Sequence, residues 1–485
     1  MVRGQGLFRK TRPSPVVTPG HGAEQLNATR LYFRSANRPL AIWGAVLLLG
    51  ALLAQLLPPV IRANNVFNGG LTITLGLYSL IGFLFLRNSF RLTLPVFILG
   101  LIQIWIVATV FLGPTILALD VKLGRNIWWP TFVMMPYFAA FVLCTIDVRW
   151  RDRILSFILG VSCFCAFVGL MQFFKLPGME SITNLYVNLE DLATYGLEQR
   201  SHGLSTHPYH LSAQCILGLG IVSSHLMYRS LKMWEIWAYA LLSAGLVVAQ
   251  ARTFYIIWAL LTIVTLCFIF WRNKAQFFKV FSVMAFVVVA LVVVFPEKLS
   301  YGLSNKNTIN EGRMEQWERA DDLSAQFPVT GIGPKETVFG SGKDLSGGGR
   351  WWTLYTESGY RMSRVSGGYI ELTLLISLVL SCLYLSFKVA KNPNVEEARR
   401  RAAFAGVYYM IALGVGLYIT NIIENELMTY YGLVLAGVIA PRAKEIWVAQ
   451  TSKRRKLHRL VADRRTLPLG QAAPAKPAIQ PTQSV

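Results

Sequence analysis

Charged side chains are scarce in this chain of 485 residues. Only 15% of the residues are Asp, Glu, Lys or Arg, whereas 54% are hydrophobic. Because a water-soluble protein carries about 25% charged residues, the shortage excludes an ordinary soluble fold and predicts a protein that crosses a membrane several times. Acidic residues are the scarcer kind, since 25 Asp and Glu stand against 47 Lys and Arg and leave a formal net charge of +22.

The positive charge lies mainly at the two ends of the chain and in short loops, which argues against nucleic acid as a partner. Residues 1–39 and 442–485 are both basic, and the second contains the run Lys453–Lys456. Basic segments beside spans follow the positive-inside rule and the attraction of anionic lipids. The first 38 residues also lack the apolar core and cleavage site of a signal peptide. We therefore expect two cytoplasmic tails, of which the C-terminal one is disordered.

Twelve hydrophobic runs have about the 20 residues that a spanning helix needs. They cover residues 40–62, 69–87, 92–113, 127–147, 153–174, 207–228, 233–250, 253–272, 278–296, 366–389, 402–420 and 424–441. An even number of spans places both termini on one side. The loops then assigned to the inside are all basic, as the positive-inside rule requires: 87–91, 147–153, 228–232, 271–279 and 388–401.

This pattern predicts an all-α polytopic membrane protein with about 12 transmembrane helices. It begins with a basic tail at residues 1–39, followed by nine spans at 40–296 and a large outward loop at 297–365. Three further spans at 366–441 and a second basic tail at 442–485 complete it. The loop is the longest polar interruption, and within it Glu311 to Phe327 predicts a short helix along the membrane face.

Arginine and tryptophan at the outward side are the first candidates for chemistry. Arg252 begins a span where basic residues are rare, so it either reaches the lipid headgroups or serves an internal polar site. Arg313 and Trp317 share a helix face at i, i+4, with Arg319 close by, and a guanidinium beside an indole suits a phosphate flanked by a sugar. The alternative is an interfacial helix that these side chains only anchor.

The segment RSHGLSTHPYH gathers Arg200, His202, His207 and His210 at the outward mouth of a span. We expect these residues to line a polar cavity, or else to cap the helix without any role in chemistry. The spacing of His207 and His210 resembles metal ligands only loosely.

No cofactor or metal is predicted. The six cysteines fall inside apolar runs, where packing is expected. The turn Gly331-Ile-Gly333 lacks the strand and helix of a nucleotide loop.

Three motifs in this order resemble the O-antigen ligase and polysaccharide polymerase family. They are Arg252 at the start of a span, Arg313-Met-Glu-Gln-Trp317 in the large loop, and Pro328-Val-Thr-Gly331-Ile-Gly333 after it. The segment Arg200–Pro208 also fits the family's approach to a span, and the resemblance covers roughly residues 195–385.

The resemblance implies a GT-C-like membrane fold and an enzyme that transfers glycans from undecaprenyl pyrophosphate without nucleotide or metal. It places the protein in the bacterial inner membrane, with both termini cytoplasmic and the active site periplasmic. The implied partners are the lipid-linked oligosaccharide, membrane lipids, and a chain-length regulator or flippase of the same pathway. Ligases of the family usually carry a histidine just before the span that follows the large loop. Residues Arg364 to Glu371 contain none, which favours a polymerase over a ligase.

For such a reaction Arg252 and Arg313 are the catalytic candidates, because they would neutralise the charge that develops on the departing pyrophosphate. Glu371, His207 and His210 are alternative candidates for the base, with Glu371 placed first. Arg361 and Arg364 would bind substrate near the headgroups, and the resemblance implies inversion at the anomeric carbon.

A secondary transporter or flippase is the alternative from another class of protein. Transporters place ionisable groups near the bilayer midplane and break their helices there, whereas these spans are nearly free of charge in their middles. A purely structural scaffold is a further alternative.

Overall fold

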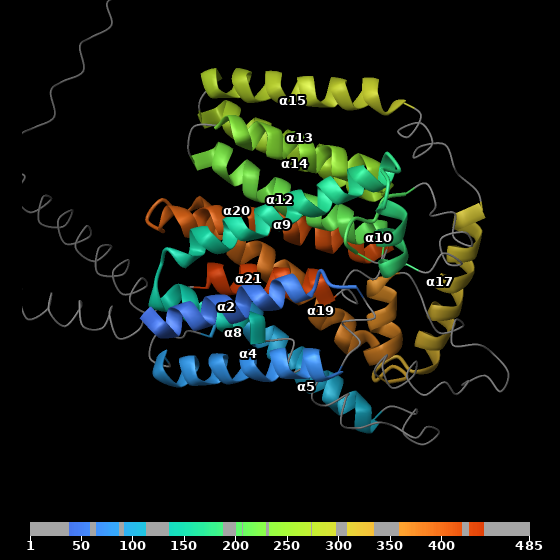
Figure 1. Ribbon diagram of the computed structural model, residues 1–485. Coiled ribbons are helices and arrows are strands. Elements are labelled where there is room, and N and C mark those ends of the chain that lie inside the picture. The colour runs from blue at the N-terminus through green and yellow to red at the C-terminus, as the bar shows by residue number, and fades with distance from the viewer. Residues whose placement is uncertain are drawn as a thin grey trace, which may run out of the picture.

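A computed structural model describes eleven stretches of the chain (Figure 1). They are residues 38–58, 65–86, 92–112, 135–187, 200–205, 207–228, 232–272, 274–296, 308–333, 358–419 and 426–440. All the regular secondary structure in these stretches is helical and forms 14 helices.

Every predicted span corresponds to a helix. These helices are α2 (Arg38–Ala54), α4 (Asn65–Leu86), α5 (Leu94–Leu112), α8 (Met135–Ile146), α9 (Trp150–Phe173), α12 (Pro208–Tyr228), α13 (Met233–Ala249), α14 (Arg252–Arg272), α15 (Lys274–Val294), α19 (Gly359–Lys391), α20 (Glu397–Ile419) and α21 (Glu426–Ile439). The other two helices are α10 (Met179–Tyr186) and α17 (Thr308–Gln326). The sequence predicted α17 but gave no signal for α10, which is only 8 residues long.

The helices have the character of membrane spans. Five of them, namely α9, α12, α15, α19 and α20, are long and apolar enough to cross a bilayer, and shorter apolar helices accompany them. On α15 the side chains of Phe286 and Val293 are 73% and 71% exposed. Such exposure of apolar side chains suits contact with lipid, and the prediction of an all-α polytopic membrane protein is confirmed.

Helix α12 forms the centre of the bundle, and 94% of its apolar window is buried. Its principal neighbours are α9, α13, α14 and α20. The backbone of α12 approaches α20 closely at Gly220, where a Cβ atom would lie 2.7 Å from the Cβ of Tyr408. The centre is therefore a helix surrounded by protein rather than by lipid.

Contacts between helix ends agree with consecutive helices that run in alternating directions. At one end of the bundle, Phe173, the last residue of α9, contacts Phe295, which follows α15, with ring centroids 5.2 Å apart. At the other end, the Tyr228 hydroxyl of α12 donates to the Ala390 carbonyl of α19 at 2.8 Å. Figure 1 shows α17 lying across the first of these ends, with α10 nearby. We call this the α17 end and the other the opposite end.

Helix α19 departs from the sequence-based expectation. It begins at Gly359, whereas the span was predicted from residue 366, and its backbone is broken at Gly368 with φ of 69°. Only glycine adopts this conformation readily, so the glycine at position 368 permits the break. It separates a short helix near the α17 end from the main span.

Candidate functional site

Two arginines of α19 meet one aspartate of α17 at the α17 end. The Arg361 Nε atom lies 3.6 Å from the Asp321 Oδ1 atom, and the Arg364 Nη2 atom donates a hydrogen bond to the same oxygen. Two guanidinium groups thus face one carboxylate, which among the described side chains leaves one positive charge uncompensated. We call Arg361, Arg364, Asp321, Trp317 and Tyr418 the arginine–aromatic cluster.

Aromatic rings support the flat faces of both guanidinium groups. The Arg361 Cζ atom lies 4.2 Å from the ring centroid of Trp317 and 5.9 Å from that of Tyr418. The Arg364 Cζ atom lies 5.7 Å from the ring centroid of Tyr369. Stacking of this kind holds a guanidinium in place while its edge remains available for hydrogen bonds.

The cluster contains more donors than acceptors. Within the described part of the chain, no hydrogen-bond acceptor meets the buried Nε atoms of Arg361 and Arg364 or the buried indole Nε1 atom of Trp317. The two arginine side chains are nevertheless 22% and 18% exposed. Because buried donors without acceptors are costly, the cluster is suited to an anion with several oxygens.

The Pro-x-x-Gly-x-Gly motif holds the break of α19. The amides of Ile332 and Gly333 donate to the carbonyls of Val365 and Ser366 at 2.8 and 3.0 Å, and the Tyr369 amide donates to the Pro328 carbonyl at 2.8 Å. These three bonds satisfy backbone groups that the break would otherwise leave without partners.

The motif and the break approach so closely that glycine is required on both sides. A Cβ atom on Gly331 would lie 2.4 Å from the Ser366 carbonyl oxygen, and one on Gly368 would lie 2.1 Å from the Val329 carbonyl oxygen. The motif is therefore a backbone clamp that fixes the arginine-bearing part of α19.

Glu371 lies in the first turn after the break. The Ser366 hydroxyl donates to the Glu371 carboxylate at 3.3 Å. A Cβ atom on Gly367 would lie 1.9 Å from the Glu371 Oε2 atom, so the carboxylate rests directly against this glycine. The Trp105 indole of α5 donates to the Gly367 carbonyl at 2.8 Å. The sequence gave no indication that Ser366 and Trp105 support this position.

Arg200 and Arg252 form a second basic group at the start of α14. Both arginines lie near the Tyr255 side chain, whose hydroxyl donates to the Val247 carbonyl at 2.6 Å. The Ser201 amide also donates to the Val248 carbonyl at 3.1 Å. The segment that carries Arg200 is thereby held against the end of α13, beside the start of α14.

The three predicted histidines differ in their surroundings. His202 is buried, and burial lowers its pKa to about 4, so the ring is neutral at physiological pH. The His207 ring stacks on Tyr209 with centroids 4.6 Å apart and lies 5.8 Å from the ring of His210. Among the described residues, no group of three His, Cys, Asp or Glu side chains is arranged to hold a metal ion.

The structure brings together some of the predicted site residues. Trp317, Arg361 and Arg364 lie in one cluster, Arg200 and Arg252 in another, and Arg319 is exposed on α17. Arg313 belongs to α17 one turn before Trp317, but its side chain lies outside the described residues.

Asp321 was missed by the sequence analysis. It lies four residues after Trp317, as Trp317 lies four after Arg313, so the i, i+4 spacing would have placed it on the same helix face.

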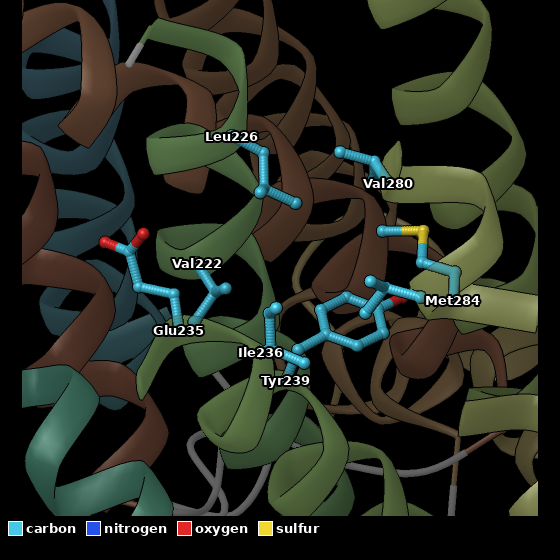
Figure 2. A pocket seen from close by; sticks show the side chains of 8 residues that line it. Val222, Leu226, Glu235, Ile236, Tyr239, Val280 and Met284 are labelled. Carbon is cyan, nitrogen blue, oxygen red and sulfur yellow. The ribbon is translucent and has the colours of Figure 1, made fainter. Parts of the chain in front are cut away.

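A small hollow at the opposite end of the bundle is not suited to polar chemistry (Figure 2). It is lined by Val222, Leu226, Glu235, Ile236, Tyr239, Val280, Val283 and Met284. The single charged group, Glu235, is turned toward the edge of the hollow in Figure 2. Its carboxylate lies 2.8 Å from the His225 Nδ1 atom and accepts a hydrogen bond from the Lys232 amide. The hollow is therefore apolar, and Glu235 fastens the start of α13.

Comparison with known proteins finds a family model that matches the region around the arginine–aromatic cluster. Residues 237–376 match the family model described as O-antigen ligase, and no curated protein matches the chain. The matched region contains most of the candidate residues and leaves out those of the segment 200–210: inside it lie Arg252, Arg313, Trp317, Arg319, Arg361, Arg364 and Glu371. Over these residues the chain matches the O-antigen ligase family, and the resemblance to O-antigen ligases and polymerases that its motifs indicated is confirmed.

Proposed function

We propose that this protein is a polysaccharide polymerase that joins repeat units carried on undecaprenyl pyrophosphate. The observation that carries the proposal is the arginine–aromatic cluster, all of whose members except Tyr418 lie within the matched region, and which offers guanidinium and indole donors without acceptors among the described residues. A guanidinium group binds phosphate through two parallel hydrogen bonds, and aromatic rings pack against sugars and lipids. The coarser statement, a membrane protein related to O-antigen ligases and polymerases, follows from the family match and the fold.

The proposed reaction is a single displacement at the anomeric carbon. A sugar hydroxyl of one repeat unit attacks this carbon, the bond to the pyrophosphate oxygen breaks, and the configuration inverts. Glu371 takes the proton of the attacking hydroxyl, held in place by Ser366. Arg252 and Arg313 stabilise the negative charge on the departing lipid pyrophosphate, and Arg361 and Arg364 bind its phosphates. No metal or nucleotide enters this scheme.

The proposed location of the reaction is the periplasmic face of the bacterial inner membrane. The loops with basic residues at 147–153 and 388–401 belong to the end opposite α17, where Arg151 pairs with Glu396 at 2.5 Å. The positive-inside rule assigns that end to the cytoplasm, which leaves the α17 end, the Arg200 segment and the loop 297–365 outside. On this assignment both basic tails are cytoplasmic.

A ligase that transfers the glycan to lipid A core is the second candidate, because the matching family model bears that description. The absence of histidine between Arg364 and Glu371 favours the polymerase. Transporters also contain broken helices, which makes a transporter a further alternative. In this protein, however, the break in α19 lies at the end of the bundle and is held by the backbone clamp.

A reconstitution with purified protein tests the proposal. The protein is given lipid-linked repeat units without nucleotide, and the products are separated by length. A ladder of glycans supports the polymerase. A single product that forms only when lipid A core is added replaces it with the ligase, and unchanged substrate under both conditions overturns glycosyl transfer.

A further inference from the structure

We propose that Asp321 is an internal competitor for the anion that Arg361 and Arg364 bind, and that a diphosphate displaces its carboxylate when substrate arrives. This inference rests on the proposed function, because it concerns how the same site is occupied before substrate binds. It adds a regulatory contact within the chain, between the outer helix α17 and the broken helix α19.

The geometry shows a site that one carboxylate fills only in part. A single oxygen of Asp321 serves both arginines, by a hydrogen bond to Arg364 and by a 3.6 Å approach to Arg361 that is too long for one. The described residues supply no acceptor for either Nε atom or for the Trp317 indole. A diphosphate brings several oxygens and a larger negative charge, so it can satisfy donors that Asp321 leaves unused.

The ion pair of Asp321 with Arg361 and Arg364 is also one that an incoming anion can replace. Its side chain is 49% exposed, so water screens the ion pair and can solvate the carboxylate once it is released. The arginines, at 22% and 18% exposed, are more enclosed, and they lie beside Tyr418 of α20 and Tyr369 of α19, which are not part of α17. We therefore expect the arginines to stay in place while Asp321 moves away.

Movement of Asp321 would release the N-terminal half of α17 from α19. After Asp321, the backbone clamp at Gly331–Gly333 holds the chain to α19, and Ala320, Ile332 and Val365 form a small apolar cluster there. Before Ala320, Trp317 stacks on Arg361, and its ring centroid lies 5.8 Å from that of Tyr418. Displacement of the carboxylate would therefore loosen the part of α17 that carries Arg313 and Trp317 and open a path to the arginines.

Binding of inorganic pyrophosphate to the purified full-length protein tests the competition. The protein is placed in phosphatidylcholine nanodiscs, and the affinity is measured by titration calorimetry for wild type, Asp321→Asn and Asp322→Asn. Asp322 is the neighbouring exposed carboxylate, so its variant has the same change in net charge. We expect Asp321→Asn to bind roughly fivefold more tightly than Asp322→Asn, as expected for loss of an exposed ion pair. Equal or weaker binding by Asp321→Asn overturns the proposal.

A second measurement needs no variant. Trypsin cleavage after the exposed Arg319 of α17 should become faster when pyrophosphate is added to wild-type protein, while cleavage after the exposed Arg153 at the opposite end stays constant. An unchanged rate at Arg319 contradicts release of α17.

A lipid headgroup could also supply the phosphate that displaces Asp321. A second set of nanodiscs distinguishes a headgroup from a diphosphate. If the pyrophosphate affinity of Asp321→Asn differs from that of wild type only in discs that contain phosphatidylglycerol, the anion that displaces Asp321 is a lipid headgroup. The assignment to a diphosphate is then wrong. The binding assay does not require polymerisation. Tighter pyrophosphate binding without any glycan ladder leaves the competition standing and removes the polymerase, whereas a ladder without tighter binding removes only the competition.

Discussion

Single residues at the α17 end differ in how they combine charge with burial. Arg361 and Arg364 keep their charges beside aromatic rings and partly exposed, whereas His202 is buried and uncharged. The sequence indicated all three as candidates from residue type and position, but it could not distinguish a ring inside the protein from one that faces a cavity. Burial depends on tertiary packing, which the local pattern around residue 202 does not contain.

Replacement of Arg252 or Arg313 by alanine should abolish the polymer while the protein remains in the membrane. Loss of one group that stabilises the developing charge costs about 10²–10³ in rate. Polymer length in cells and the amount of protein in the membrane fraction are the measurements. The matched control is Lys279→Ala, an exposed cation near the start of α15 at the opposite end. Normal chain lengths in either arginine variant would exclude that residue from the mechanism.

His202 should make the stability of the protein depend on pH. Its pKa is lowered to about 4 in the folded protein, against about 6.5 in an unfolded chain. The unfolded state therefore binds the extra proton as the pH falls below about 6.5, and roughly 2 kcal/mol of stability is lost by pH 5. Thermal unfolding at pH 7.5 and pH 5 should show a smaller drop in Tm for His202→Gln than for wild type. The partly exposed His207, changed to Gln, serves as control, and equal drops in all three proteins would refute the assignment.

At the scale of helices, the broken helix α19 is the least regular element of the described structure. The sequence predicted a span at this position but not the break, because Gly-Gly within an apolar run is compatible with an unbroken helix. What decides the conformation is the motif Pro328–Gly333, which pairs with the break from a distance of more than thirty residues along the chain. The sequence indicates this motif as a family feature but does not reveal its backbone partner.

Gly368→Ala should destabilise the protein strongly. A side chain at positive φ costs roughly 1–2 kcal/mol, and the added Cβ atom would also meet the Val329 carbonyl oxygen at 2.1 Å. We expect a lower Tm in detergent and less protein in the membrane. Gly160→Ala on α9 is the matched control, because nothing lies within 4 Å of its added Cβ atom. A Tm for Gly368→Ala equal to that of Gly160→Ala would show that the clamp does not require glycine.

At the scale of the whole molecule, hydrophobic runs were sufficient to predict the order of the apolar helices along the chain. Each predicted span corresponds to a helix, and the contacts of Phe173 with Phe295 and of Tyr228 with Ala390 agree with the alternation that the charge pattern predicted. The neighbours of each helix were not predictable, because the apolar faces of membrane helices resemble one another in sequence. The central place of α12 is visible only in the folded structure.

The sidedness of the bundle can be tested with single cysteines and a maleimide that does not cross membranes. Ser341→Cys, in the loop assigned outside, should be labelled in intact spheroplasts. Asn394→Cys, exposed in the turn between α19 and α20, should be labelled only after the cells are broken. The exposed Cys267 is replaced by serine in both proteins. Labelling of position 394 in intact spheroplasts would invert the proposed topology.

The burial of α12 has a consequence for how the protein is made. Its best window has a mean hydropathy of 1.3, against 2.4 for α9 and 2.7 for α15. A segment this weakly apolar gains little from contact with acyl chains alone, and its Gln214 side chain donates a hydrogen bond to the Ser162 hydroxyl of α9 at 3.1 Å. We therefore expect α12 to leave the translocon together with α9 and α13 as one preassembled group during synthesis. Its assembly would depend on helices made both before and after it.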